Sequence, residues 1–201
     1  TNPPLSNSIS WGTIEQDNYP STMNAFDTEL IKLAAMGVTV MVSSGDDGVS
    51  GDECGCDNDS GSAASSWSGT NSWSGTGYFP SFPASSPYVV AVGGTMGPNE
   101  GSPESVCSSR DGGVITSGGG FSTYYPRPTY QDTVIPDYLS LVSGSTTDPT
   151  SGYNPSGRGY PDISMLATYY PVVIAGRTLT LFGTSASSPV FAAMISLINA
   201  E

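Results

Sequence analysis

The segment at residues 182–189 places a serine where a nucleophile would be presented. Its sequence, FGTSASSP, sets Ser185 between a Gly-Thr turn and an apolar stretch that begins at Val190. If a helix starts here, its free backbone N–H groups favour developing negative charge beside the serine. Ser185 could also serve only as a helix cap. The chain contains no histidine, so serine chemistry would need a carboxylate or another base to take the proton.

A second polar cluster follows an apolar run. Residues 38–42 (VTVMV) have the pattern of a fully buried strand in a parallel sheet. They lead into the turn SSGDDG at residues 43–48. Because sites in open α/β sheets lie at the carboxyl ends of strands, we expect this turn to carry chemistry.

The remaining pattern predicts an α/β fold in a single domain that covers residues 1–201, since no internal boundary or repeat interrupts it. In chain order, the other expected elements are a strand at 6–10, an amphipathic helix at 21–36 capped by Ser21 and stopped by Gly37, a strand at 88–92 with a turn at 93–95, a mostly irregular stretch from 124, a hairpin at 169–181 turning at Ala175-Gly176, and a buried helix after Ser185.

The charge balance excludes some partners. Eighteen acidic residues against five basic ones give a net charge of −13, which repels nucleic acid phosphates and anionic lipid. No apolar run is long enough to span a membrane. Such a surface suits acid, because protonated carboxylates repel one another less. We therefore expect a secreted or lysosomal/vacuolar-type protein in an acidic compartment. Arg127 and Arg158 are more simply explained by buried ion pairs than by substrate binding.

The cysteines point the same way. Cys54 and Cys56 are too close to bridge each other comfortably, so we expect one of them to pair with Cys107 and the other to find a partner outside this chain. Asn58 opens a glycosylation sequon in the same loop. Zinc binding by Cys54 and Cys56 is a weaker alternative, because the chain has no histidine and only one further cysteine.

Six ordered motifs resemble the sedolisins, or serine-carboxyl peptidases, and in particular their tripeptidyl peptidase I-like branch. They are GTSASSP at 183–189, SGDDG at 44–48, SGGGFS at 117–122, FPASSPYV at 82–89 with VGGT at 92–95, YPRPTYQ at 125–131, and SGRGYPD at 156–162. The first motif alone would also suit subtilisins. The resemblance implies a subtilisin-like parallel sheet flanked by helices, here as an incomplete catalytic domain, and a peptide or unfolded protein as substrate.

The resemblance also implies roles for individual residues. The nucleophile maps onto Ser185, and the oxyanion-hole aspartate maps onto Asp46, where subtilisins carry asparagine. Only a protonated Asp46 can donate a hydrogen bond to an oxyanion, so we expect activity at acid pH. The resemblance implies that the backbone of Ser10, Trp11 and Gly12 would pair with an extended peptide. It also implies two walls for the pocket that holds the residue before the scissile bond. Ser43, Ser44 and Gly45 would form one wall, and Gly118, Gly119 and Gly120 the other.

Two parts of the family pattern do not map onto this chain. The family's base is a glutamate with an aspartate four residues later on one helix. In the family this helix lies a few dozen residues before the segment that matches residues 8–12, so we expect it outside this chain. Glu53 and Asp57 have this spacing but lie in a Cys/Gly loop. The resemblance implies calcium, whose ligands we expect beyond residue 201, so no metal ligands are assigned here. We expect the missing segments of the same peptidase to be partners of this chain.

Two other functions stay open at this point. A catalytically inactive peptide-binding or structural relative would keep the fold and lack the base. An ordinary subtilisin-type protease would take its histidine from outside this chain, although Asp46 argues against that reading.

Overall fold

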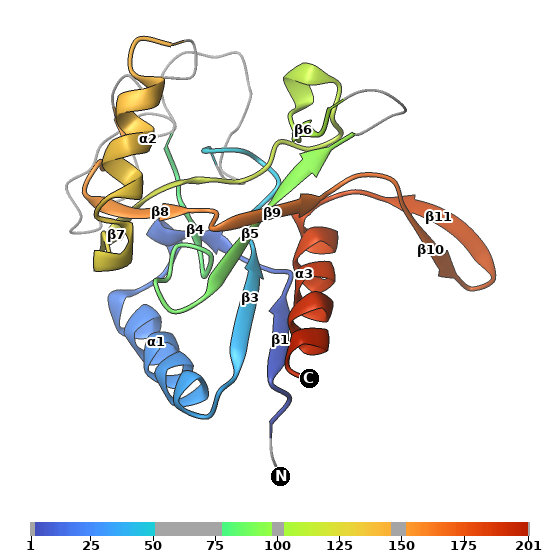
Figure 1. Ribbon diagram of the computed structural model, residues 1–201, viewed down its shortest axis with the longest axis horizontal. Helices are drawn as coiled ribbons and strands as arrows, with labels where there is room; N and C mark the ends of the chain where they lie inside the picture. Colours follow the sequence, from blue (N-terminus) through green and yellow to red (C-terminus); the bar gives the residue numbers. More distant parts are fainter. Residues whose placement is uncertain (1–2, 51–77, 98–102, 146–151, 201) are drawn as a thin grey trace.

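A five-stranded sheet forms the centre of the computed structural model, which describes residues 3–50, 78–97, 103–145 and 152–200 (Figure 1). Four strands run parallel in the order β1 (Ser6–Ile9), β3 (Thr39–Ser43), β5 (Val90–Met96) and β9 (Ile163–Leu166). The short strand β6 (Ser105–Val106) pairs antiparallel with the end of β5. The predicted strands at 6–10 and 38–42 are thus confirmed to within one residue.

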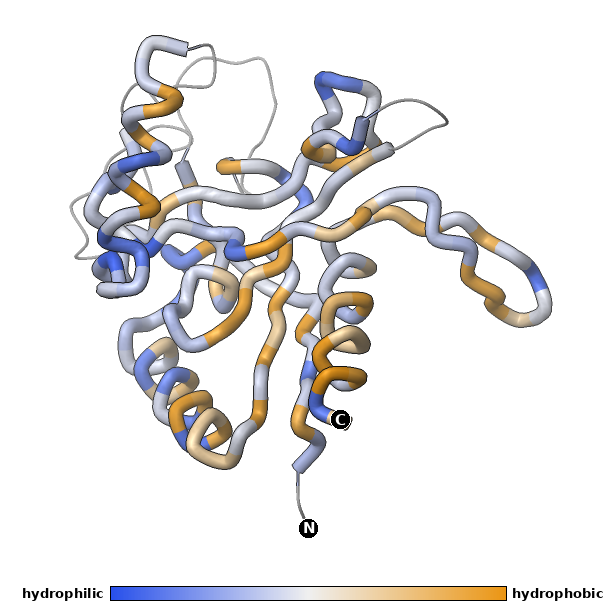
Figure 2. The backbone as a smooth tube through the Cα atoms, in the orientation of Figure 1, coloured by the Kyte–Doolittle hydropathy of each residue, from blue (hydrophilic) through white to orange (hydrophobic). Residues whose placement is uncertain are grey.

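The sheet is buried on both faces, as its apolar strands predict. Val40 and Val42 of β3 belong to the cluster on the side of helix α1 (Pro20–Ala35). Between them, Met41 packs with Val92 and with Ala192 of helix α3 (Thr184–Ile198). Side chains alternate along a strand, so one strand contributes to both cores. Figure 2 shows hydrophobic colour along the strands and the helices beside them.

Helix α1 begins earlier than expected. Its N-cap is Tyr19 and not Ser21, because Pro20 occupies the first helical position, where its fixed φ suits the helix and its missing N–H costs nothing. The helix ends at Ala35, and Gly37 follows with a φ of +77°. The expected stop at Gly37 is therefore confirmed, and the cap at Ser21 was wrong.

The expected turn at residues 93–95 was also wrong. β5 continues through these residues to Met96, so the glycines here form strand. A Cβ on Gly93 would come within 2.8 Å of the side chains of Pro161 and Ser164, and one on Gly94 within 2.7 Å of Ala167. These glycines therefore allow close approach of neighbouring chain, which is a second common use of glycine within strands.

The smaller elements complete the frame around the sheet. β2 (Thr13–Ile14) pairs with β4 (Ser81–Phe82), and β7 (Gly120–Pro126) pairs with β8 (Gly157–Tyr160). Short 3-10 turns lie at Glu15–Asp17 (η1), Ser109–Asp111 (η2) and Thr129–Gln131 (η3). Helix α2 (Val134–Val142), β8 and β9 lie where the sequence indicates mostly irregular structure.

The predicted hairpin at residues 169–181 is confirmed. β10 (Tyr170–Ile174) and β11 (Arg177–Leu181) pair antiparallel and project away from the body (Figure 1). Ala175 and Gly176 form the turn with φ of +50° and +76°, the left-handed conformation that two-residue hairpin turns require. None of the helices in the described part of the chain is long and apolar enough to cross a membrane.

A buried ion pair links β8 to the loop that follows it and, through that loop, to β5. Arg158 is fully buried and lies 2.5 Å from Asp162, whose Oδ2 also accepts the backbone N–H of Ala91 at 2.8 Å. The expectation of a buried pair is confirmed for Arg158. For Arg127 it was wrong, because its partner Asp132 at 3.5 Å is largely exposed, and such surface pairs contribute little to stability.

Candidate functional site

Ser185 is the second residue of α3, and its side chain is exposed. Gly183 precedes the helix with a φ of +126°, so the chain turns sharply just before the serine. The Ser185 hydroxyl lies 3.5 Å from the carbonyl oxygen of Ser10, and the Ser10 hydroxyl donates to the carbonyl of Ser185 at 2.9 Å. The segment after β1 is therefore fastened to the start of the helix that carries the serine.

Asp46 lies in the turn after β3 and reaches the same helix start. Its Oδ1 accepts the backbone N–H of Thr184 at 2.8 Å and also contacts the Thr184 hydroxyl at 2.8 Å. A Cβ on Gly183 would lie 2.8 Å from Oδ2. Because Asp46 occupies the first N–H of the helix, the N–H of Ser185 in the same turn is the next one without an intrahelical partner. The Asp46 carboxyl, the Ser185 hydroxyl and the N-terminus of α3 therefore lie next to the same cavity.

This cavity has a volume of about 280 Å³. Ser10, Trp11 and Gly12 line it together with Ser43, Gly45 and Asp46, and Ser185 lies at the same cavity. The structure therefore brings together both candidate catalytic residues and five of the nine candidate substrate-binding residues. Trp11 is 81% exposed, so most of its side chain is accessible to solvent beside the cavity.

The other four candidates lie differently. Ser44 is buried, and a Cβ on Gly118 would come within 2.1 Å of the Ser44 carbonyl oxygen. The Gly118 N–H donates to the carbonyl of Gly45 at 2.7 Å. Gly118, Gly119 and Gly120 thus support the back of the Ser43–Gly45 turn, and they line a separate cavity of about 770 Å³.

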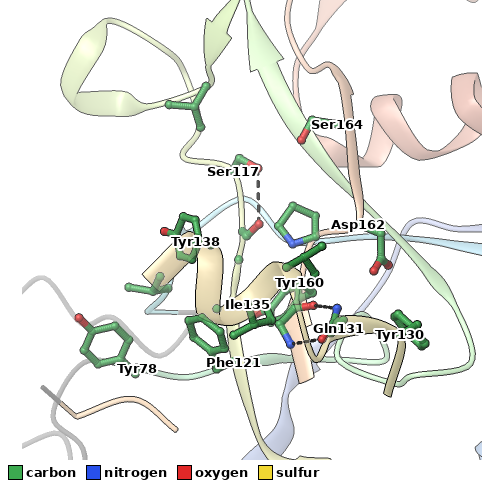
Figure 3. A pocket seen from close by; sticks show the side chains of 18 residues that line it. Tyr78, Ser117, Phe121, Tyr130, Gln131, Ile135, Tyr138, Tyr160, Asp162 and Ser164 are labelled. Carbon is green, nitrogen blue, oxygen red and sulfur yellow. Dashed lines mark hydrogen bonds between the residues drawn. The ribbon is translucent and has the colours of Figure 1, made fainter. Parts of the chain in front are cut away.

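This second cavity has mostly apolar and aromatic walls. Phe121, Tyr138 and Tyr160 surround it in Figure 3. The amide of Gln131 holds Gly159 at its edge, accepting the Gly159 N–H at 3.0 Å and donating to its carbonyl at 2.7 Å (Figure 3). The three glycines face this space and not the cavity at Ser185, so the structure assigns the two predicted walls to two neighbouring cavities.

Sequence reasoning missed two residues that shape the site. Thr184 links the two catalytic candidates, because its hydroxyl also accepts the Gly45 N–H at 3.2 Å. Its place beside Ser185 in the motif could have indicated this role. Glu15 lies buried behind the cavity and binds Ser122 and Thr123. More than a hundred residues separate these partners, so no local pattern could have revealed the contact.

Several residues named from the sequence fall outside the described residues, namely Glu53, Cys54, Cys56, Asp57 and Asn58. Cys107 is buried and has no disulfide partner within the part of the chain that the structure describes; its thiol lies 3.4 Å from the carbonyl of Ile115, and burial raises its pKa. The expected disulfide is therefore not confirmed. Among the described residues, no group of three or more histidine, cysteine, aspartate or glutamate side chains could hold a metal ion, so the calcium implied by the family has no donor set there.

Two buried carboxyls predict that the fold is more stable in mild acid than at neutral pH. Burial raises the pKa of Glu15 and of Asp27, although hydrogen bonds from Ser122 and Ser86 partly oppose it. Between the ordinary pKa, near 4, and the raised one, the folded protein binds more protons than the unfolded chain. The stabilising contribution is complete below the ordinary pKa and is lost as pH rises through the raised one.

Denaturant unfolding of the full-length protein should therefore give a larger free energy of unfolding at pH 5 than at pH 7. Asp27→Asn, which cannot ionise, should flatten this dependence. Glu29→Gln is the matched control, because Glu29 is exposed on the same helix, and it should leave the dependence as in the wild type. Greatest stability at pH 7 or above would contradict the prediction.

Comparisons with known proteins find peptidases that are similar to this chain. No family model matches the chain. Tripeptidyl-peptidase 1 of Dictyostelium discoideum is 38% identical over 200 residues, which are 98% of this chain and 28% of that protein. Tripeptidyl-peptidase 1 of Homo sapiens is 37% identical over 204 residues, which are 98% of this chain and 31% of that protein. The chain thus spans less than a third of the length of these relatives.

A solved structure shows the same fold. Pseudomonas sedolisin, a serine-carboxyl proteinase complexed with two molecules of pseudo-iodotyrostatin, matches with a TM-score of 0.63 and 33% identity. The match covers 94% of this chain and 46% of the sedolisin chain. The expected parallel sheet flanked by helices is confirmed. Over nearly its whole length, the chain is therefore a homologue of the tripeptidyl-peptidase 1 and sedolisin peptidases, and it has their subtilisin-like fold.

Proposed function

We propose that this chain is the nucleophile-bearing part of a serine-carboxyl peptidase that hydrolyses peptide bonds at acid pH. One observation carries the proposal: the Ser185 hydroxyl, the N-terminus of α3 and the Asp46 carboxyl lie at one cavity. An alcohol beside a helix N-terminus and a carboxyl group is what acyl transfer requires when no imidazole is present.

The reaction follows from these positions. Ser185 Oγ attacks the scissile carbonyl carbon, and its proton passes to a carboxylate base supplied by a segment outside this chain. The oxyanion that forms accepts hydrogen bonds from the Ser185 N–H and from the protonated Asp46. When the tetrahedral intermediate collapses, the C–N bond breaks and the amine takes the proton from the base. Water then hydrolyses the ester in the same way and releases Ser185.

Binding of the peptide would use the segments that line the first cavity. An extended peptide can pair with the backbone of Ser10–Gly12 as an added strand, while Ser43 and Gly45 form the opposite wall. We assign Ser44 to the support of that wall, because it is buried. Gly118, Gly119 and Gly120 would extend the binding surface toward the second cavity.

The surroundings of the enzyme follow from its charge. A net charge of −13 and two buried carboxyls with raised pKa both favour the folded protein in acid. We therefore propose a secreted or lysosomal/vacuolar-type location. The other segments of the same peptidase would supply the base and the calcium site.

The test uses the full-length protein and peptide substrates between pH 3 and 8. We expect hydrolysis with an acid optimum, and we expect a serine-reactive phosphonate to label Ser185, as mapped by mass spectrometry.

A peptide-binding relative without activity is the second candidate, because the Ser185 hydroxyl is bonded to a carbonyl and not to a carboxylate in the described residues. Peptide binding without hydrolysis or labelling at any pH would establish that second candidate.

A further inference from the structure

A buried glutamate lies directly behind the peptide-binding segment. Glu15 is 3% exposed and follows Ile14, which lines the cavity at Ser185. Glutamate is seldom buried unless partners compensate for the lost hydration. The sequence motifs that indicate the peptidase function leave this residue without a role.

The partners of Glu15 come from a distant part of the chain. Its Oε1 accepts the hydroxyl of Ser122, and its Oε2 accepts the backbone N–H and the hydroxyl of Thr123, both at 2.8 Å. Ser122 and Thr123 belong to β7, which begins at Gly120. The carboxyl group therefore fastens the end of the peptide-binding segment to the strand that continues from the three glycines.

Both oxygens are required as acceptors. Ser122 Oγ already accepts the backbone N–H groups of Tyr124 at 3.1 Å and Tyr125 at 2.7 Å. A hydroxyl has two lone pairs and one proton, so the proton of Ser122 can only be donated to Glu15. The backbone N–H of Thr123 can likewise only donate.

The Thr123 hydroxyl makes the contact tolerant of protonation. It can donate to an ionised carboxylate or accept from a protonated one, so the three bonds persist in either state. The titratable groups that face Glu15 are the phenols of Tyr125 on β7 and Tyr160 on β8, with Asp27 of α1 beyond Tyr125. None of these is a cation that would fix Glu15 in its ionised form.

Other contacts complete a closed path around the cleft. The Glu15 N–H donates to the carbonyl of Pro80 at 2.7 Å, and the next residue, Ser81, lines the cavity. At the far end of the path, Gly118 donates to Gly45, the neighbour of Asp46. The segment at residues 10–14 is thus connected through Glu15 and the segment at 118–123 to the opposite wall.

We propose that Glu15 is a positioning residue that fixes the segment at residues 10–14 against the segment at 118–123 and so sets the width of the peptide cleft. This inference rests on the proposed function. Ser185 and Asp46 are held together through Thr184, independently of Glu15. Loss of Glu15 should therefore weaken peptide binding more than it slows the chemical step.

The decisive variant is Glu15→Gln in the full-length protein. Glutamine has one carbonyl oxygen, so its NH₂ group must face either the Ser122 hydroxyl or the Thr123 N–H, and both are donors. A buried donor left without an acceptor typically costs the equivalent of roughly tenfold in an equilibrium constant. We expect KM for peptides to rise about tenfold by that principle, while kcat and phosphonate labelling of Ser185 stay within about twofold. Glu29→Gln should behave as wild type.

Thr123→Val gives a second, milder measurement. It removes only the hydroxyl bond to Glu15 and retains the backbone one. We expect KM to rise about threefold, since one hydrogen bond is lost but no backbone donor is left without an acceptor. If Glu15→Gln does not fold, the KM of Thr123→Val tests the proposal in its place. If the wild type binds peptides without hydrolysing them, the proposed function fails, and the peptide Kd takes the place of KM in the same comparison.

Two results would overturn the proposal. An unchanged KM in Glu15→Gln, or in Thr123→Val where the first variant does not fold, would show that the cleft does not depend on this contact. An equal loss of peptide hydrolysis and of phosphonate labelling would show that Glu15 only stabilises the fold.

Discussion

Replacing Ser185 with alanine is expected to abolish peptide hydrolysis, with a loss on the order of 10⁴-fold or more in kcat, as is typical when a nucleophile is removed. Without the hydroxyl no acyl-enzyme can form. The side chain is exposed, and its hydrogen bond to Ser10 is long at 3.5 Å, so the fold should be unaffected. The measurement is kcat/KM of the full-length protein near pH 4, roughly the carboxylate range, together with its Tm.

Ser196→Ala is the matched control for this substitution. Ser196 is exposed on the same helix, eleven residues farther along, which is about 16 Å along the helix axis. This variant should retain wild-type activity and stability. Turnover by Ser185→Ala at the wild-type rate would refute the assignment of the nucleophile.

The second large effect is expected at Asp46. Asp46→Ala removes a donor to the oxyanion, which typically costs on the order of 100- to 1,000-fold in kcat. It also removes the group that accepts the Thr184 N–H at the start of α3, which costs about 1 kcal/mol of stability. Both kcat and the free energy of unfolding measured with denaturant should therefore decrease.

Asp46→Asn separates these two contributions. Because Oδ1 receives the N–H of Thr184, the amide oxygen of asparagine should take that place, and the NH₂ group should take the place of Oδ2. This group donates at every pH, whereas a carboxyl donates only when protonated. The variant should keep its stability and remain active at higher pH than the wild type, as a pH profile of kcat/KM would show.

Asp47 supplies the control for the pH profile. It neighbours Asp46 and lines the same cavity, so its carboxyl group is the other one there that could donate to the oxyanion. Asp47→Asn should keep the acid optimum of the wild type. If the optimum moves with Asp47 and not with Asp46, the two aspartates must exchange roles.

Local pattern predicted the frame of this protein well. The apolar run at residues 38–42 indicated a strand buried on both faces, and Met41 and Val42 are indeed completely buried. The rule that sites lie at the carboxyl ends of strands pointed to the turn at residues 43–48, which contributes to the cavity at Ser185. Residues that act through their immediate neighbours are therefore accessible to sequence reasoning.

Features that depend on distant contacts were not accessible. Gly93 and Gly94 resemble a turn in sequence. They form strand because residues 161–167 run alongside β5 and pack closely against both glycines. Likewise, Gly118–Gly120 were expected at the cavity of Ser185, but the close approach of Gly118 to the Ser44 carbonyl directs them to the next cavity. Contacts between distant residues determine the structure in such cases, and the local pattern of apolar residues does not predict them.

The hydrogen atom that Gly183 carries in place of a side chain has one more consequence. Since a Cβ there would lie 2.8 Å from the Asp46 carboxyl, that carboxyl can stand this close to the start of the helix only when residue 183 has no side chain. A methyl group at this one position would push the Asp46 carboxyl away from the N-terminus of α3, even in a protein whose core is otherwise unchanged.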